Sequence, residues 1–241
     1  MHNEELAARY SNILSEMDLS LIEGSGTDNG LSGIFLSTVG DGYANAANKI
    51  MVIGCETAGW TLLPPTGPDG MADYIARSMA KHRRFLDKQL QSRNARGHTF
   101  HNFIRSVTRK SGSDGLVYAN LFCFDWKQGS PMKHPRFAEI KRHSQALLKA
   151  QIDVLQPDII IFANGMNTAN CRREYFPIDG PGQVCTNGRD HVSAGIGRDH
   201  LWEFDLDGRI RCFRIHHPSA RSKGAAHARE FLIGLLPAAS E

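Results

Sequence analysis

The sequence predicts an α/β protein with three layers, in which helices cover both faces of a central four-stranded parallel sheet. Four short runs of β-branched and other apolar residues have the length of buried strands, and helical patterns lie between them. Polar residues follow three of these strands, where open α/β sheets keep their chemistry. At 241 residues the chain fits one domain, with an amino-terminal helix and approach segment at 1–48 and a core at 49–236.

Strand and helix patterns alternate along this core. The first strand is the apolar run 50–53, which stops at Gly54. Apolar runs bounded by turn residues predict the remaining strands at 116–122, 158–162 and 210–215. Apolar residues at helical spacing predict amphipathic helices at 4–17, 72–93, 100–107, 137–155 and 224–236. Prolines and glycines between 61 and 70 predict a loop that follows the turn at Gly54.

Composition and cysteine spacing limit the class of protein. The net charge of +3 and the pI near 8.6 permit a polyanionic partner without requiring one. No apolar run approaches the roughly 20 residues of a membrane span, and the first ten residues lack the apolar core of a secretion signal. The five cysteines include no C-x-x-C pair, which argues against a zinc ribbon or a local iron–sulfur motif. We therefore expect a reduced cytoplasmic location, with no membrane partner, metal or cofactor.

Three side chains near the strand ends carry useful chemistry. Glu56 comes two residues after Gly54, Asn120 lies close to the end of the second strand, and His217 follows the last strand. A carboxylate, an amide and an imidazole supply an acceptor, a bidentate hydrogen-bonding group and a neutral donor. Each also has a structural interpretation: Glu56 as a turn or N-cap carboxylate, Asn120 as an amide bonded to its own loop, and His217 as a satisfied strand-end histidine.

These three motifs, in this order and with these separations, resemble the uracil-DNA glycosylase superfamily. The motifs are GCETAGW at 54–60, Asn120 within YANLF, and HHPSARS at 216–222. The resemblance covers roughly residues 49–236, although the specific motifs are short. It implies a four-stranded parallel sheet between helices and a monofunctional DNA glycosylase, which flips a pyrimidine out of DNA and hydrolyses its N-glycosidic bond.

The first family motif, Gly-Gln-Asp-Pro-Tyr-His, is only partly retained. The resemblance places Gly54 on its glycine and Glu56 on the acid that orients the attacking water. The family's glutamine, proline and tyrosine fall on Cys55, Thr57 and Ala58, which are departures. Cys55 and Ala58 would then lie beside the flipped base.

The other motifs are closer to the family pattern. His-Pro-Ser-Pro-Leu-Ser becomes HPSARS at 217–222, so the resemblance places the catalytic histidine on His217 and the duplex-penetrating leucine on Arg221. We expect Ser219, Arg221 and Ser222 to contact DNA. Asn120 falls on the asparagine that reads the pyrimidine. In this scheme Glu56 would position water, and His217 would stabilise the anionic leaving base, a contribution of about 3 kcal/mol for one preorganised donor.

Ala58 bears on the identity of the base. In the uracil-specific branch a tyrosine here blocks substituents at pyrimidine C5, so alanine predicts an open C5 side. Candidate bases are thymine or a hydroxymethylated or glycosylated cytosine of phage DNA, which would suit antiphage defence in bacteria, or uracil itself. Alternatively, Trp60 or the 64–70 loop fills the space.

Other side chains bear on stacking with the base, on Schiff-base chemistry and on metal binding. Candidates for stacking on the base are Phe100, Phe103, Phe122 and Phe124, of which the last two are nearest to Asn120 in sequence. Nothing marks Lys127 as a Schiff-base lysine, so we expect hydrolysis by water without strand cleavage. The histidines that lack a zinc-protease pattern are His98, His101, His134 and His143.

The predicted function is thus a monomeric, base-excising DNA glycosylase of the bacterial cytoplasm, with no metal or other cofactor. The departures at Cys55, Thr57 and Ala58 favour an alternative, a non-catalytic nucleic-acid or nucleotide sensor on the same fold. An unrelated α/β hydrolase is disfavoured because the sequence contains neither a G-x-S-x-G elbow nor a P-loop.

Overall fold

The computed structural model describes residues 1–23, 30–66 and 69–239 and confirms the α/β class. Three short stretches lie outside the described residues: 24–29 of the approach segment, 67–68 of the proline- and glycine-rich loop, and 240–241 at the carboxyl end. Within the described ranges, no helix is long and apolar enough to cross a membrane.

The chain divides into two compact units whose segments alternate along the sequence. Unit 1 comprises Met1–Val39, Cys55–Leu86 and Ala119–Gln156. Unit 2 comprises Gly40–Gly54, Asp87–Tyr118 and Pro157–Glu241. The alternation explains why no linker or shift in composition marks a boundary in the sequence, and a single folding domain stays a prediction.

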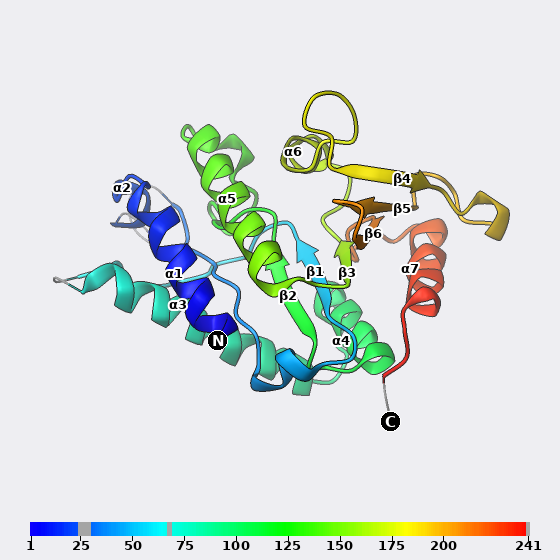
Figure 1. Cartoon of the computed structure of the whole chain (residues 1–241), viewed down its shortest axis with the longest axis horizontal. Helices are drawn as coiled ribbons and strands as arrows, with labels where there is room; N and C mark the ends of the chain where they lie inside the picture. The colour runs from blue at the N-terminus through cyan, green and yellow to red at the C-terminus, as the bar shows by residue number, and fades with distance from the viewer. Residues whose placement is uncertain (24–29, 67–68, 240–241) are drawn as a thin grey trace. The chain divides into compact units, whose positions relative to one another are not determined.

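The sheet has six strands and is mixed, so the prediction of four parallel strands was too simple. Its order is β2-β1-β3-β6-β5-β4 (Figure 1). The pairs β1–β3 and β3–β6 are parallel, whereas β6–β5 and β5–β4 are antiparallel. The strands are β1 (Ile50–Gly54), β2 (Leu116–Asn120), β3 (Ile159–Phe162), β4 (Cys185–Arg189), β5 (Leu201–Leu206) and β6 (Ile210–Ile215).

The two strands that the sequence did not predict form one edge of the sheet. Four of the five residues of β4 are exposed, so it carries no apolar pattern. Asp207 and Gly208 turn the chain between β5 and β6, and both have positive φ. An Asp-Gly pair between apolar segments is a strong hairpin signal, and it would have indicated β5. The inner strands β1 and β3 are buried at every position, as is typical of parallel strands with both faces covered.

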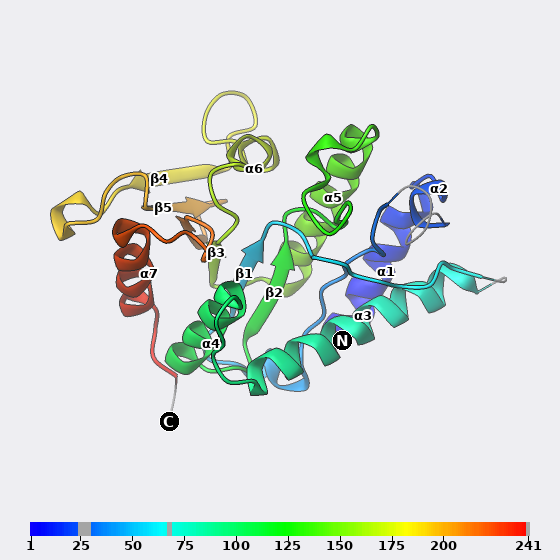
Figure 2. The ribbon, with the colours of Figure 1, turned by 180° about the vertical axis from the view of Figure 1, so that it is seen from behind.

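The helices of unit 2 form two groups beside the sheet. Helices α4 (Thr99–Ser111) and α7 (Lys223–Leu235) lie side by side in Figures 1 and 2, and α7 packs on β6. The short helix α6 (Ala169–Tyr175) follows β3 and was not predicted. Two 3₁₀ helices complete the unit, at Asp41–Asn45 and Val192–Ala194.

Unit 1 is largely helical. Helix α1 (His2–Ser15) packs along α5 (Phe137–Leu155), and both views show them side by side (Figures 1 and 2). The remaining helices are α2 (Ser20–Glu23), the 3₁₀ helix Pro131–Lys133, and most of α3 (Gly70–Gln91). Residues 31–39 are buried, and apart from the β-bridge between Leu31 and Trp126 they lie outside helices and strands. Side chains of α3 satisfy part of their backbone. Tyr74 Oη accepts from Ile34 N at 2.9 Å, and Ser78 Oγ donates to Ile34 O at 2.6 Å.

Candidate functional site

The turn after β1 is held by a buried carboxylate that the sequence did not single out. Asp125 is 2% exposed, and its Oδ2 accepts from Thr57 Oγ1 at 2.7 Å. The same oxygen accepts from the backbone N–H groups of Gly59 at 2.9 Å and Trp60 at 3.1 Å. Several donors on one carboxylate fix the turn strongly, because charge-assisted hydrogen bonds exceed neutral ones in strength. The hydroxyl of Thr57 therefore has a role that the family's proline could not perform.

Asp125 is itself fixed from its other side. Its Oδ1 accepts from Gln128 N at 3.1 Å, its N–H donates to Ser32 Oγ at 2.9 Å, and its carbonyl accepts from Ser32 N at 2.9 Å. The sequence does contain a signal for Asp125, because it is the one acid within the otherwise apolar run 121–126 and is therefore expected to be buried with partners. Its partners lie 65 to 68 residues earlier in the turn and 93 residues earlier at Ser32, so the pattern alone could not identify them.

Glu56 lies within this fixed turn and is electrostatically unfavourable as an ion. Burial first, and the nearby charge of Asp125 second, raise the pKa of Glu56 to about 7. Its Oε2 is buried and has no hydrogen-bond partner among the described residues. Asp125 rather than Glu56 supplies the carboxylate that holds the turn, so the structural interpretation of Glu56 loses its support. An acid of this kind exchanges a proton near neutral pH.

Asn120 ends β2 with an unsatisfied amide. The residue is 6% exposed, and both side-chain polar atoms are buried without a partner in the part of the chain that the structure describes. The interpretation as an amide bonded to its own loop therefore finds no support. Leaving buried polar groups unpaired costs about 1–3 kcal/mol, which a ligand presenting a donor and an acceptor would recover.

The segments that carry Glu56 and Asn120 lie side by side in unit 1. The backbone N–H of Phe122 donates to the carbonyl of Cys55 at 2.8 Å, which joins the residues after β2 to the residues after β1. Cys55 is half-buried, and Ala58 is exposed. The prediction that these two residues contact a base remains a prediction.

Phe122 is a core residue, which counts against its predicted contact with a base. Its ring is fully buried and packs edge to face on Phe137, with centroids 5.5 Å apart and planes at 78°. Phe124 is also fully buried, and Phe103 is 5% exposed. Of the four candidate phenylalanines, Phe100 alone retains a half-buried ring.

His217 lies in unit 2, where its ring is stacked and its tautomer is set. The ring lies nearly parallel to Phe100, with centroids 5.8 Å apart and planes at 13°. The Ser219 N–H donates to His217 Nδ1 at 3.2 Å, and Ser219 Oγ lies 2.7 Å from the same nitrogen. Because Nδ1 accepts from a backbone N–H, the neutral ring carries its proton on Nε2. Burial first, and Arg229 second, lower the pKa of His217 and so favour this neutral form.

Two further contacts position the loop that carries His217. Gly165, three residues after β3, has φ of +73°, and a Cβ there would lie 3.3 Å from His217 Cβ. Arg229 Nη1 donates to the carbonyl of Ala220 at 3.2 Å, which ties the loop to α7. Beside Pro218, between α4 and α7, is an open cavity of about 450 Å³. The sequence indicated neither contact.

The three predicted DNA-binding residues, Ser219, Arg221 and Ser222, are all exposed. The hydroxyl of Ser222 accepts from Ala225 N at 3.2 Å and so caps α7. Ser222 thus has a structural role, and DNA contact by any of the three residues remains a prediction.

No family model matches this chain, and neither does any curated protein. The functional conclusion therefore depends on the residues themselves.

Proposed function

We propose that the protein is a monofunctional DNA glycosylase that hydrolyses the N-glycosidic bond of a flipped pyrimidine. The observation that carries the proposal is Glu56, a half-buried residue with a raised pKa and one buried carboxylate oxygen that has no partner among the described residues, in a turn held by Asp125. A fold gains no stability from placing two acids together away from water. Such arrangements are typical of catalytic carboxylates, whose pKa is matched to reaction near neutral pH.

Glu56 would act in its ionised form. Loss of the base leaves an oxocarbenium-like sugar, and a carboxylate would stabilise that positive charge and accept a hydrogen bond from the attacking water. With a pKa near 7, a substantial fraction of Glu56 is ionised at neutral pH. The expected rate then increases as pH rises through 7.

His217 would donate a hydrogen bond from Nε2 to the pyrimidine oxygen that gains negative charge as the base leaves. Its accepting Nδ1 and lowered pKa support a neutral donor. A donor already oriented toward the developing charge needs no proton transfer to contribute.

Asn120 would read the flipped base. Its buried amide has a free donor and a free acceptor among the described residues, the pair needed to recognise a pyrimidine edge. The order β2-β1-β3-β6 also agrees with the proposal. These four strands would correspond to the family sheet, with β5 and β4 as an added hairpin.

The surroundings of Ala58 favour a base modified at C5. Its side chain is small and exposed. Trp60, the alternative occupant of this space, is 4% exposed and packs on Phe35 and Phe85, with centroids 5.1 and 5.7 Å away. We therefore propose thymine or a hydroxymethylated or glycosylated cytosine of phage DNA ahead of uracil, and a role in antiphage defence.

Release of free base, measured by mass spectrometry, tests this proposal. The substrates are unmodified, uracil-containing and phage-modified DNAs, with Glu56→Gln as the inactive variant and the exposed Glu16→Gln as its matched control. We expect the wild type and Glu16→Gln to release one modified pyrimidine, and Glu56→Gln to release none. Excision of uracil alone would reject the C5 hypothesis, and no release from any DNA would reject the enzyme.

A sensor on the same fold is the second candidate. Near neutral pH, Glu56 is partly protonated and can donate a hydrogen bond, which suits binding as well as catalysis. DNA affinity distinguishes the two functions. Loss of product in Glu56→Gln with unchanged affinity supports the glycosylase, whereas absence of product from both proteins with retained affinity supports the sensor.

A further inference from the structure

Unit 2 contains a second cavity, of about 420 Å³, that involves none of the residues discussed above. The sheet register aligns two of its lining residues, Arg214 of β6 and Trp202 of β5, with the buried Phe162 of β3. Residues paired in this way project from the same face of a sheet. Helix α6 contributes Arg172 to the lining, and its guanidinium lies 5.9 Å from the Phe162 ring centroid.

Arg172 is a buried cation with one unsatisfied guanidinium nitrogen among the described residues. The residue is 9% exposed, and its Nη1 has no hydrogen-bond acceptor among the described residues. Burial first, then repulsion by Arg214 and Arg173, lower its pKa to about 10. Even so, the guanidinium is charged at neutral pH. A buried charge with an unsatisfied donor is costly, so its presence on a cavity wall suggests an anionic ligand.

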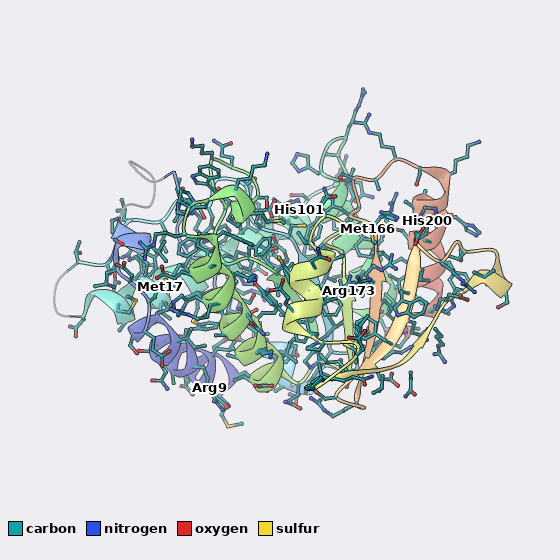
Figure 3. All side chains as sticks on the ribbon, turned by 90° about the horizontal axis from the view of Figure 1, so that it is seen from above. Arg9, Met17, His101, Met166, Arg173 and His200 are labelled. Atoms are coloured by element: carbon teal, nitrogen blue, oxygen red, sulfur yellow. The ribbon has the colours of Figure 1, made fainter. Side chains whose placement is uncertain are left out.

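The charges around the cavity are predominantly positive. Arg214 is 8% exposed and donates to the backbone carbonyls of Asp199 and Arg198 instead of to a carboxylate. Arg173, labelled on α6 in Figure 3, is exposed and also lines the cavity. Arg198 is paired with Asp190 at 2.8 Å, which leaves Asp199 as the one acid against three arginines among the described lining residues.

The remaining wall is aromatic and apolar. Phe176, Phe204 and Trp202 line it, and the 45%-exposed Ile178 extends it to the surface. Gly188 of β4 lies against Trp202, since a Cβ at this position would be 2.9 Å from the indole Cζ2. The indole can therefore pack directly on the backbone of Gly188. An aromatic and apolar wall of this kind favours a ligand with a flat ring, a preference that the arginines alone would not provide.

We propose that this cavity binds a mononucleotide, with its phosphate on Arg172 and Arg173 and its base against Trp202. Arginine forks match phosphate oxygens and would satisfy the orphaned Nη1. The volume lies within the range of small-molecule sites. The site is separate from the proposed glycosylase residues and does not depend on their function.

Calorimetric titration of the full chain tests the proposal. The ligands are the four common nucleoside 5′-monophosphates, the matching nucleosides and inorganic phosphate. We expect at least one monophosphate to bind at least tenfold more tightly than either its nucleoside or phosphate, because each of these lacks one half of the contact.

Single substitutions test the phosphate-binding and the base-binding parts of the site separately. We expect Arg172→Met to weaken the nucleotide at least tenfold. Trp202→Leu should weaken the nucleotide severalfold and leave phosphate binding unchanged. The exposed Arg209→Met is the charge-matched control, and Glu56→Gln tests separation from the glycosylase site; both should bind as the wild type does. Arg172→Lys, which keeps the charge without the fork, provides a second weakened variant if the methionine variant does not fold.

Four outcomes would overturn the proposal. They are no binding of any monophosphate, affinity that is unchanged in both folded Arg172 variants, phosphate binding as tight as nucleotide binding, and loss of nucleotide binding in Glu56→Gln. Arginine-dependent binding of an oligonucleotide, with no mononucleotide binding, would instead identify a contact to the DNA backbone.

Discussion

Glu56, which is half-buried, and Glu203, which is buried, have opposite electrostatic environments. Glu203 in β5 is 2% exposed, and its Oε1 accepts from Arg189 and, at 2.7 Å, from Arg211. Burial would raise its pKa, but hydrogen bonds from the two arginines outweigh burial and lower it. Glu56 forms no ion pair with a cation among the described residues and lies near the charge of Asp125, so its pKa rises. Burial alone therefore does not decide the ionisation of a carboxylate, and the one that lacks cations is the candidate for chemistry.

The largest expected effect is on the proposed reaction. Glu56→Gln keeps the shape of the side chain and removes the negative charge. We expect base release to fall at least a hundredfold, as is typical for loss of one preorganised electrostatic group. Single-turnover rates measure this effect. Glu203→Gln, provided that it remains folded, should release base at near the wild-type rate; equal losses in both variants would remove the distinction between the two acids.

Asp125 should be essential to the geometry around Glu56. Asp125→Ala removes the acceptor of the Thr57 hydroxyl and of three backbone N–H groups. We expect destabilisation by about 3 kcal/mol, measured by urea unfolding. Asp125→Asn should destabilise less and also lower the pKa of Glu56, since the like charge is lost. The exposed Asp153→Asn is the control, and a Glu56 pKa that did not respond to Asp125→Asn would contradict this assignment.

The two glutamates should respond to amidation with opposite signs in stability. Glu203→Gln removes the charge that the two arginines neutralise, so we expect a loss of about 1–3 kcal/mol at pH 8. Glu56→Gln removes an unfavourable buried charge, so we expect a gain of about 1–2 kcal/mol after allowance for partial exposure. Denaturant unfolding at pH 8 compares them directly. A change of the same sign in the unfolding free energy of both variants would contradict the predicted difference between the two glutamates.

The pH dependence of stability gives a further expectation. Because the folded-state pKa of Glu56 lies above its ordinary 4.5, the folded state binds the extra proton between pH 4.5 and about 7. The Glu56 contribution to unfolding free energy therefore decreases as pH rises through this window. The difference in unfolding free energy between the wild type and Glu56→Gln, measured across this pH range, isolates the contribution of Glu56. A difference that stayed constant from pH 4.5 to 8 would contradict the raised pKa.

The smallest expected effect concerns Gly165, and the chain supplies a matched control. Gly165 and Gly180 have nearly the same φ, +73° and +72°, but only Gly165 lies against His217, and a Cβ at Gly180 would meet nothing within 4 Å. Both alanine variants should lose about 1 kcal/mol from backbone strain. Gly165→Ala alone should also slow base release, because it displaces His217. Equal rates in the two variants would show that the contact is unimportant.

Local patterns predicted much of the fold. Helix α5 and strand β6 have the bounds expected from spacing and apolar content, and the other predicted elements lie within a few residues of their positions. The polar edge strand β4 has no such pattern. The Asp207-Gly208 turn is a hairpin signal that would have indicated β5, but the predictions relied on hydrophobic periodicity and did not use it.

The candidate site was less accessible to sequence reasoning. Glu56, Asn120 and His217 stood out because each lies near a strand end with reactive chemistry. Asp125 supports the turn through partners that are far away in the chain. Arg172 stands out only because its Nη1 has no hydrogen-bond acceptor among the described residues. Neither feature can be read from a local sequence pattern. Phe122 is fully buried, since nearness in sequence to Asn120 does not determine whether a ring faces the core, and its contact with a base stays a prediction.

A direct measurement of the Glu56 pKa tests the central claim. Carbon-13 NMR of the side-chain carboxyls, with Glu56→Gln to assign the resonance, would follow Glu56 and Glu203 in one titration. We predict a midpoint near 7 for Glu56 and one below the ordinary value for Glu203. A Glu56 midpoint near 4.5 would show that the carboxylate is solvated or paired, and would contradict the proposed basis of its function.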